Sequence, residues 1–355
     1  MALTGASTSV VDMSSDTTGL VIAKGTTAER NAISSPQAGM IRNNTETDKV
    51  EVYNGADWRN LVEAGNATPP LIVDYLVVAG GGGGASGYGA SGAGGGAGEF
   101  LYKTAQTLTL GGSGYTVTVG AGGIGGQVTN STVGSAGAQG GDSVFIQTTK
   151  GGGFGRPAGG SPAGVYVGSD GGSGGGGTFN GAGGASIATS PGLGFAGGAG
   201  YSTTNYGSGG GGGAGSAGIN GTSTSGGNGG AGVQNSITGV SPAPYYAAGG
   251  GAGLYNLTSV TGIGGSGIGG SSYYNQNATD GAANTGSGGG GACTYLGNIY
   301  QGGDGGSGVV ILRYPDAYTI NFQTGVGFIS STATLSATSE KVTTITAGSG
   351  TITFV

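Results

Sequence analysis

The chain has 355 residues, of which 93 are glycine and none is histidine; 7% are charged, and the net charge is −6. The absence of histidine excludes Ser-His-Asp and Cys-His catalytic sites and histidine-based metal sites, and the lack of any basic run argues against binding to nucleic acid or to an anionic membrane. The single cysteine, Cys293, cannot form an intrachain disulfide and is expected to be a buried thiol. A chain of this length predicts two or three domains.

Residues 1–63 are expected to form an attachment and oligomerisation region. The first 21 residues have no basic segment followed by an apolar core, so no signal peptide is predicted. No stretch approaches the ~20 apolar residues of a membrane-spanning helix, so no membrane insertion is expected. Residues 40–43, residues 50–53 and Trp58, with an Asn54-Gly55 turn between the last two, predict three short strands. Such a module is too small to be stable alone and needs neighbours, most simply copies from other chains.

Residues 64–70 end in two prolines and are predicted to be a linker. A glycine-rich domain is predicted over 71–315, and three structures compete for it. Collagen is excluded because glycine comes in blocks and only 9 residues are proline. A flexible linker is the compositional default, but the many spaced tyrosines argue against it. We favour packed polyglycine II helices: threefold extended helices without internal hydrogen bonds, which glycine allows to lie close enough to bond one another.

Apolar runs bracket this domain. Residues 74–79 and 309–314 are expected to pair as antiparallel strands, which would place Asp74 beside Arg313 as an ion pair. Residues 108–119 predict a hairpin around the turn 111–114. The polyglycine layers are expected mainly in 151–306. Residues 316–355 alternate as short strands and predict a C-terminal β region, either a small domain or strands that complete a sheet on a neighbour. The fold class is therefore all-β with polyglycine II helices.

Chemistry is scarce in this composition. Gly-x-Gly-x-x-Gly arises from glycine content alone, and no phosphate-binding loop with its lysine is present, so no cofactor is expected. Residues 137–144 come within one mismatch of a calcium-binding nonapeptide, but no tandem copy follows, and no metal is expected. A glycosidase needs two carboxylates about 5–10 Å apart. The domain interior offers Glu99, Asp142, Asp170, Asp280 and Asp304; Asp142 and Asp304 are interpreted as turn caps. The protein is expected not to be an enzyme.

Tyrosines punctuate the glycine blocks. Tyrosine gives a large contact area at low entropic cost and, together with Ser, Gly and Asn, is typical of adaptable binding loops. Several of these rings could instead cap the ends of a glycine sandwich. The candidate receptor-binding residues are Tyr201, Tyr206, Tyr245, Tyr246, Tyr255, Tyr273, Tyr274 and Tyr295.

Four blocks, taken in order, resemble the glycine-rich domain of bacteriophage tail proteins: Asp74-Tyr-Leu-Val-Val-Ala followed by five glycines, Tyr115-Thr-Val-Thr-Val-Gly-Ala-Gly-Gly, Gly140-Gly-Asp-Ser-Val-Phe, and Gly305-Gly-Ser-Gly-Val-Val-Ile-Leu-Arg-Tyr. The composition is also similar in style to the glycine-rich adhesins at the tips of T-even-type tail fibres. In those adhesins, polyglycine helices form a sandwich whose far-edge loops bind the host receptor. The resemblance implies binding to a host-surface protein or glycan.

A second resemblance lies in the N-terminal region. Thr27-Ala-Glu-Arg, then Gly39-Met-Ile-Arg-Asn-Asn-Thr, then Val50-Glu-Val-Tyr-Asn-Gly and Trp58 resemble a short module of phage tail fibres and other virion proteins, which is commonly trimeric. It implies a homotrimer that attaches to other virion proteins through its N-terminal region. The expected location is the virion, after synthesis in the host cytoplasm. The alternative is a capsid decoration or head-fibre protein with a purely structural role.

Overall fold

The computed structural model describes residues 22–61, 70–87, 91–128, 134–159, 166–203, 206–255, 261–294 and 298–355. The chain divides into two compact units, Met1–Thr68 and Pro69–Val355. The first 21 residues, most of the linker predicted at 64–70, and Tyr295 lie outside the described residues.

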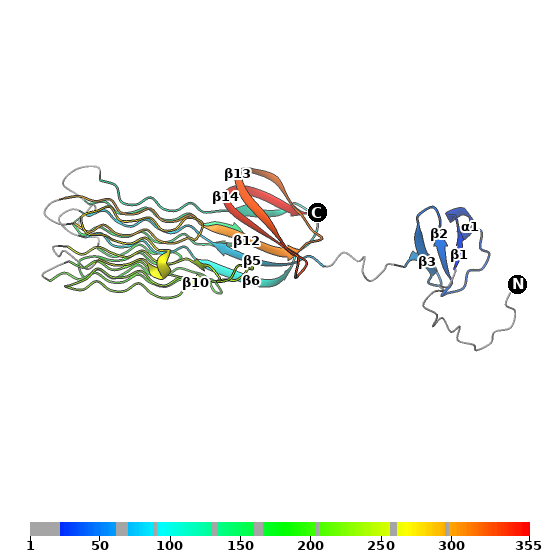
Figure 1. Ribbon diagram of the computed structural model, residues 1–355, viewed down its shortest axis with the longest axis horizontal. Coiled ribbons are helices and arrows are strands. Elements are labelled where there is room, and N and C mark those ends of the chain that lie inside the picture. The colour runs from blue at the N-terminus through cyan, green and yellow to red at the C-terminus, as the bar shows by residue number, and fades with distance from the viewer. Residues whose placement is uncertain are drawn as a thin grey trace. The chain divides into compact units, whose positions relative to one another are not determined.

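The N-terminal unit is a small sheet with one short helix (Figure 1). Its strands, in the order β1-β2-β3-β4, are β1 Ala23–Gly25, β2 Ile41–Asn44, β3 Lys49–Tyr53 and β4 Trp58–Asn60. The helix α1, Thr27–Asn31, was not anticipated, although its sequence signal is present. Thr26 and Glu29 form a capping box in which each side chain accepts the other residue's main-chain N–H, at 3.2 and 2.7 Å.

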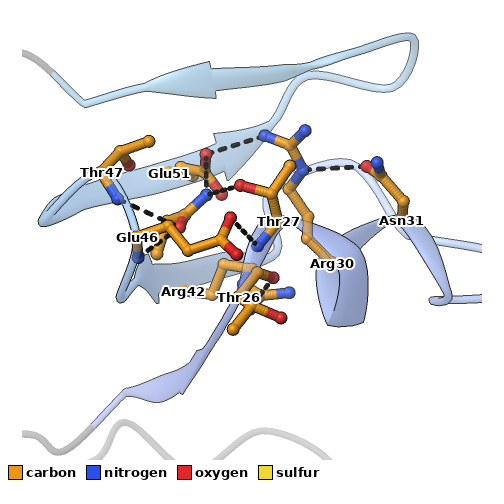
Figure 2. Close-up of polar contacts among 9 residues, drawn as sticks. Thr26, Thr27, Arg30, Asn31, Arg42, Glu46, Thr47 and Glu51 are labelled. Carbon is orange, nitrogen blue, oxygen red and sulfur yellow. Dashed lines mark hydrogen bonds and ion pairs between the residues drawn. The ribbon is translucent and has the colours of Figure 1, made fainter.

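Polar residues of the sheet are buried beneath α1, and Figure 2 shows the contacts among them. Glu51 on β3 is 3% exposed, and its Oε1 accepts hydrogen bonds from Arg30 Nη1 at 2.8 Å and Asn44 Nδ2 at 3.0 Å. Asn44 also donates to Thr27 Oγ1 at 3.0 Å. These contacts fasten α1 to β2 and β3 through charge and hydrogen bonding.

The second unit contains an eight-stranded sheet in which strands distant in sequence are neighbours. The order is β6-β5-β12-β14-β7-β8-β9, and β13 pairs with β14. The bounds are β5 Ile72–Val78, β6 Phe100–Thr107, β7 Tyr115–Thr118, β8 Ser143–Phe145, β9 Gln147–Thr149, β12 Val309–Pro315, β13 Ile320–Leu335 and β14 Glu340–Phe354. A separate pair, β10 Val233–Gln234 and β11 Tyr245–Tyr246, and a short 3-10 turn, η1 Gly265–Gly267, complete the elements. Two apolar clusters pack against the large sheet, one containing Tyr75, Phe145 and Ile352 and the other Leu76, Phe100 and Ile311.

Between the strands, glycine segments run side by side away from the sheet (Figure 1). The 79–87 segment shows the bonding pattern. Its N–H groups take three directions in turn: Gly80, Gly83 and Ser86 donate to the 134–142 segment, Gly81, Gly84 and Gly87 to 298–308, and Gly82 and Ala85 to 91–99. A repeat of three residues per direction is the period of a threefold extended helix. The predicted polyglycine II helices are therefore confirmed.

The same segment also accepts bonds from three other neighbours. The 120–128, 150–159 and 286–294 segments donate to its carbonyl groups, so that 79–87 is bonded to six surrounding segments. The 91–99 and 206–214 segments likewise each have six bonded neighbours. The interior therefore satisfies its main-chain polar groups laterally, in place of helix or sheet ladders.

At most of the inner glycines this packing leaves no room for a side chain. A Cβ at Gly211 would lie less than 3.0 Å from the carbonyl oxygen of Gly95, and one at Gly82 would meet Gly153 in the same way. The helices begin directly after β5, so the expectation that the polyglycine layers lie mainly in 151–306 was too narrow. Up to residue 149 glycine segments are interspersed with strands of the large sheet, and from there to β12 they follow one another with only the short pair β10–β11 among them.

The bracketing strands pair as predicted, but with different polar partners. β5 and β12 are antiparallel, and Arg313 lies opposite Asp74. The predicted ion pair between them is wrong: Arg313 Nε donates to Glu340 on β14 at 2.9 Å, and Asp74 accepts the main-chain N–H of Ala105 at 2.7 Å. Hydrogen bonding to Arg313 holds the pKa of Glu340 below its usual range.

The predicted hairpin over 108–119 is also wrong. Residues 108–110 form no strand, and β7 pairs with β14 and β8. The turn exists, with φ of 75°, 80° and 77° at Gly111, Gly112 and Gly114, but a glycine turn does not specify which strand a segment joins.

The C-terminal residues are β-structured, but they form neither a separate domain nor strands for a neighbouring chain. β14 lies between β12 and β7, so the hairpin β13–β14 completes the sheet of the glycine-rich domain itself. It contributes Ile345, Ile352 and Phe354 to the core. The boundary predicted at 315/316 is therefore not a structural division.

A glycine substitution tests the packing. We expect Gly211→Ala to lower the free energy of unfolding by about 3 kcal/mol, because the new methyl group overlaps a main-chain oxygen that cannot move away alone. Gly141→Ala is the matched control, since the nearest atom to its Cβ is the nitrogen of Ala121 at 3.0 Å. Thermal unfolding followed by circular dichroism measures both, and equal stability of the two variants would contradict the packing.

A truncation tests the role of the C-terminal hairpin. Removal of residues 316–355 is expected to abolish cooperative unfolding and to cause aggregation, because β12 and β7 lose the strand between them and expose their edges. Removal of residues 1–61, which lie in the other unit, is the control and should leave the transition of the second unit unchanged. Calorimetry of a truncated chain that unfolds like the full chain would exclude this role.

Candidate functional site

The interior between the glycine segments holds only small side chains, such as those of Ala97 and Ser173. Large side chains can gather where the segments end. We call the end of these segments farthest from the sheet the distal end. The 79–87 segment leaves β5 toward it, and the 91–99 segment returns from it to β6. Tyr166, Tyr206, Tyr255 and Tyr300 each lie at or next to the point where a glycine segment reaches this end.

Four rings form a continuous row there, which we call the aromatic row: Tyr166, Phe179, Tyr206 and Tyr255. The ring centroids are 5.1 Å apart for Tyr166–Phe179, 4.7 Å for Phe179–Tyr206 and 5.7 Å for Tyr206–Tyr255. The first two pairs are edge-to-face, which is a favourable geometry for aromatic contacts. All four rings are partly exposed, so the row is both packed and accessible to a ligand.

Phe179 occupies the centre of the row in an unusual backbone conformation. Its φ is 45° and that of Asn180 is 60°, in a tight turn closed by the N–H of Gly181 donating to the carbonyl of Thr178 at 2.7 Å. Positive φ is rare for a bulky residue, and such outliers occur often at functional sites. The turn directs this ring into contact with both neighbours.

A cation lies beside the row. The Arg156 guanidinium stacks 4.7 Å from the ring centre of Phe154, and its Nε donates to the carbonyl of Val167 at 3.3 Å. Val167 directly follows Tyr166, so Arg156 is bonded to the residue next to one end of the row.

The structure divides the tyrosines predicted from sequence. Tyr206 and Tyr255 belong to the row. Tyr201 lies nearby, where its N–H donates to the carbonyl of Gly207 at 2.8 Å and its hydroxyl accepts from Thr203 at 2.6 Å. Tyr273, 46% exposed, precedes a turn at the same end, and Tyr274 is the first residue of that turn. Tyr295 cannot be placed, because it lies outside the described residues.

Two of the predicted binding residues lie elsewhere. Tyr245 and Tyr246 form β11 at the sheet end of the glycine segments. Tyr246 is 6% exposed and packs against Phe100 on β6, with ring centroids 6.5 Å apart; burial raises the pKa of its hydroxyl. The assignment of Tyr246 to a binding loop is corrected: it is a core residue. Tyr245 is exposed, but at the end opposite the row.

The sequence-based candidates omitted Tyr166, Phe179 and Arg156. The feature that could have identified these three residues is their position along the glycine runs. Each stands where a glycine run is interrupted on the distal side, and Phe179-Asn180 is a two-residue turn within such an interruption. A search for aromatic residues of any type, at those interruptions of the glycine runs that fall on the distal side, would have identified the row.

The interior carboxylates serve the scaffold. Each accepts a main-chain N–H: Glu99 from Lys150 at 2.9 Å, Asp142 from Gly151 at 2.9 Å, Asp170 from Ala185 at 2.6 Å, Asp280 from Asp304 at 2.7 Å and Asp304 from Gly125 at 2.7 Å. Asp142 and Asp304 thus bridge separate segments, which corrects their interpretation as local turn caps. Within the described ranges, no group of three or more His, Cys, Asp or Glu side chains could hold a metal ion.

Cys293 is fully buried, as predicted, and its Sγ donates to the carbonyl of Leu254 at 2.8 Å. Burial raises the pKa of the thiol, which keeps it protonated and unreactive.

Two family models match the chain. A glycine-rich domain matches residues 64–315, well over half of the chain. The chain belongs to this glycine-rich domain family. A phage tail-like trimerisation region matches residues 3–70. No curated protein matches the chain.

The two matches together indicate what type of protein this glycine-rich domain protein is. It is a structural protein of the phage tail-fibre type, its trimerisation region indicates a homotrimer, and its location is the virion. Among the described elements, no helix is long and apolar enough to cross a membrane; α1 has five residues.

Proposed function

We propose that the protein is a tail-fibre or appendage adhesin whose glycine-rich domain presents its distal end to a receptor on the host surface. The aromatic row carries this proposal. Four partly exposed rings in contact, with Arg156 beside them, offer a large and rigid amphipathic surface of the kind enriched at binding hot spots.

The scaffold supports such a role. Each inner glycine segment is bonded to its neighbours along its length, so the residues at the distal end project from a stiff base. Binding sites on rigid elements lose less entropy when they engage a ligand. The receptor class consistent with exposed rings and one cation is a surface protein or a glycan.

We further propose that the protein is not an enzyme. The five interior carboxylates accept main-chain hydrogen bonds that join glycine segments, which gives each a structural reason to be present. The N-terminal region is proposed to join the protein to other virion proteins.

Paired tyrosine variants test the adhesin proposal. Labelled protein is incubated with whole cells of a panel of bacterial strains, and the bound fraction is measured by flow cytometry. We expect the wild type to bind at least one strain, and Tyr255→Ser combined with Tyr273→Ser to reduce binding about 10-fold or more, as loss of aromatic anchors does.

Tyr245→Ser is the matched control, because Tyr245 is 40% exposed and Tyr273 is 46% exposed, but they lie at opposite ends of the domain. The control should bind like the wild type, and thermal unfolding confirms that all variants are folded. Absence of binding to every strain, or equal loss in the control, would overturn the proposal and favour a capsid decoration or head-fibre protein with a purely structural role.

A further inference from the structure

In the N-terminal unit the buried side chains are polar, whereas an ordinary protein interior is apolar. Of the apolar side chains that are buried in the described residues, none belongs to 22–61, whereas the polar residues Arg42, Asn44 and Glu51 are 6%, 0% and 3% exposed. A sheet whose buried side is charged lacks the main driving force for folding, since burial of apolar surface supplies it.

Four apolar residues lie together on the other face of the sheet, whereas Tyr53 and Trp58 are in contact on the side that carries Glu51. Ile41 pairs directly with Val52, and Asn43 pairs with Val50. Directly opposed residues share a face, and alternate residues of a strand point the same way. Leu61, whose N–H donates to the carbonyl of Val50 at 2.7 Å, continues this arrangement beyond β4. We call Ile41, Val50, Val52 and Leu61 the apolar face. The register places Asn43, Lys24 and Arg59 on the same side of the sheet.

This face is open in a single copy. Ile41 is 48% exposed, Val50 37% and Leu61 47%, and Val52 is partly exposed. The opposite face carries Glu51 and α1, so the helix does not cover the apolar one.

The polar side cannot compensate for this exposure. The Arg30–Glu51 pair is held at 2.8 Å, but a buried ion pair roughly offsets its own desolvation and adds little net stability. Two buried atoms, Arg42 Nε and Glu51 Oε2, have no hydrogen-bond partner in the described structure. A unit of this size with no apolar core requires association to be stable.

The occupant of the face is another copy of the same chain, because the trimerisation match spans residues 3–70 and therefore contains the whole unit. We propose that three copies bring their apolar faces together around a common axis, so that Ile41, Val50, Val52 and Leu61 of each chain form the hydrophobic core that one chain lacks. The Arg30–Glu51–Asn44 cluster then holds α1 on the outside of the trimer.

Substitution of the full-length chain tests the interface. Light scattering after gel filtration should give about three times the 33.2 kDa chain mass for the wild type. Ile41→Lys and Val50→Lys should each yield monomer at concentrations at which the wild type is trimeric. Ile263→Lys, at an apolar residue of the other unit that is 64% exposed, is the control and should remain trimeric. A trimeric Val50→Lys variant, or a monomeric wild type, would overturn the proposal.

A lysine substitution could also abolish the trimer by unfolding the N-terminal unit. A crosslinking experiment, which introduces no charge, therefore accompanies the lysine variants. Cys293 is fully buried, so a single introduced cysteine is the one accessible thiol among the described residues. On oxidation, Val50→Cys should form interchain disulfides, seen as dimers on a non-reducing gel. Asn60→Cys, which lies opposite Glu51 on the other face, should not. No crosslink at Val50, or an equal crosslink at Asn60, would contradict the proposal whatever the lysine variants show.

Discussion

Lateral main-chain hydrogen bonding between glycine segments is the interaction on which the rest of this structure depends. In the 79–87 segment, successive N–H groups point to three neighbours in turn, and three other segments donate to its carbonyls. Ordinary secondary structure satisfies these groups within one helix or one sheet. Here a bundle of segments shares them, and the arrangement is possible only because the segments approach to distances that exclude a Cβ, as at Gly82 and Gly211.

This constraint limits where large side chains can be buried. Apolar side chains collect around the sheet at one end, where Tyr75, Phe100 and Ile352 form part of the core. Four aromatic side chains that are not part of that core form a row at the distal end, where Phe179 connects its neighbours. A scaffold whose interior holds only small side chains therefore has an apolar core at the sheet and a row of aromatic rings at the distal end.

Much of this architecture was predictable from sequence, and the failures have physical reasons. Glycine that comes in blocks, with too little proline for collagen, indicated threefold helices. The apolar runs around residues 76 and 311 indicated the antiparallel pair β5–β12. The position of β14 was not predictable, because alternation identifies a strand and not its neighbours. For the same reason Arg313 has Glu340 as its partner in place of Asp74. At the candidate site, tyrosine content identified Tyr206 and Tyr255, but it could not separate them from Tyr246, since burial depends on which end of a segment a residue occupies.

The claim that the glycine segments form a single bonded lattice is tested most directly by hydrogen–deuterium exchange of their amide groups. The lattice predicts slow exchange throughout 79–87 and 91–99, comparable to that of β5 and β12, even though these residues form neither α-helix nor sheet. It also predicts slower exchange at Gly82 than at Gly111, which lies in an exposed turn. Exchange of the 79–87 and 91–99 amides within seconds, as in a flexible glycine linker, would contradict the lattice.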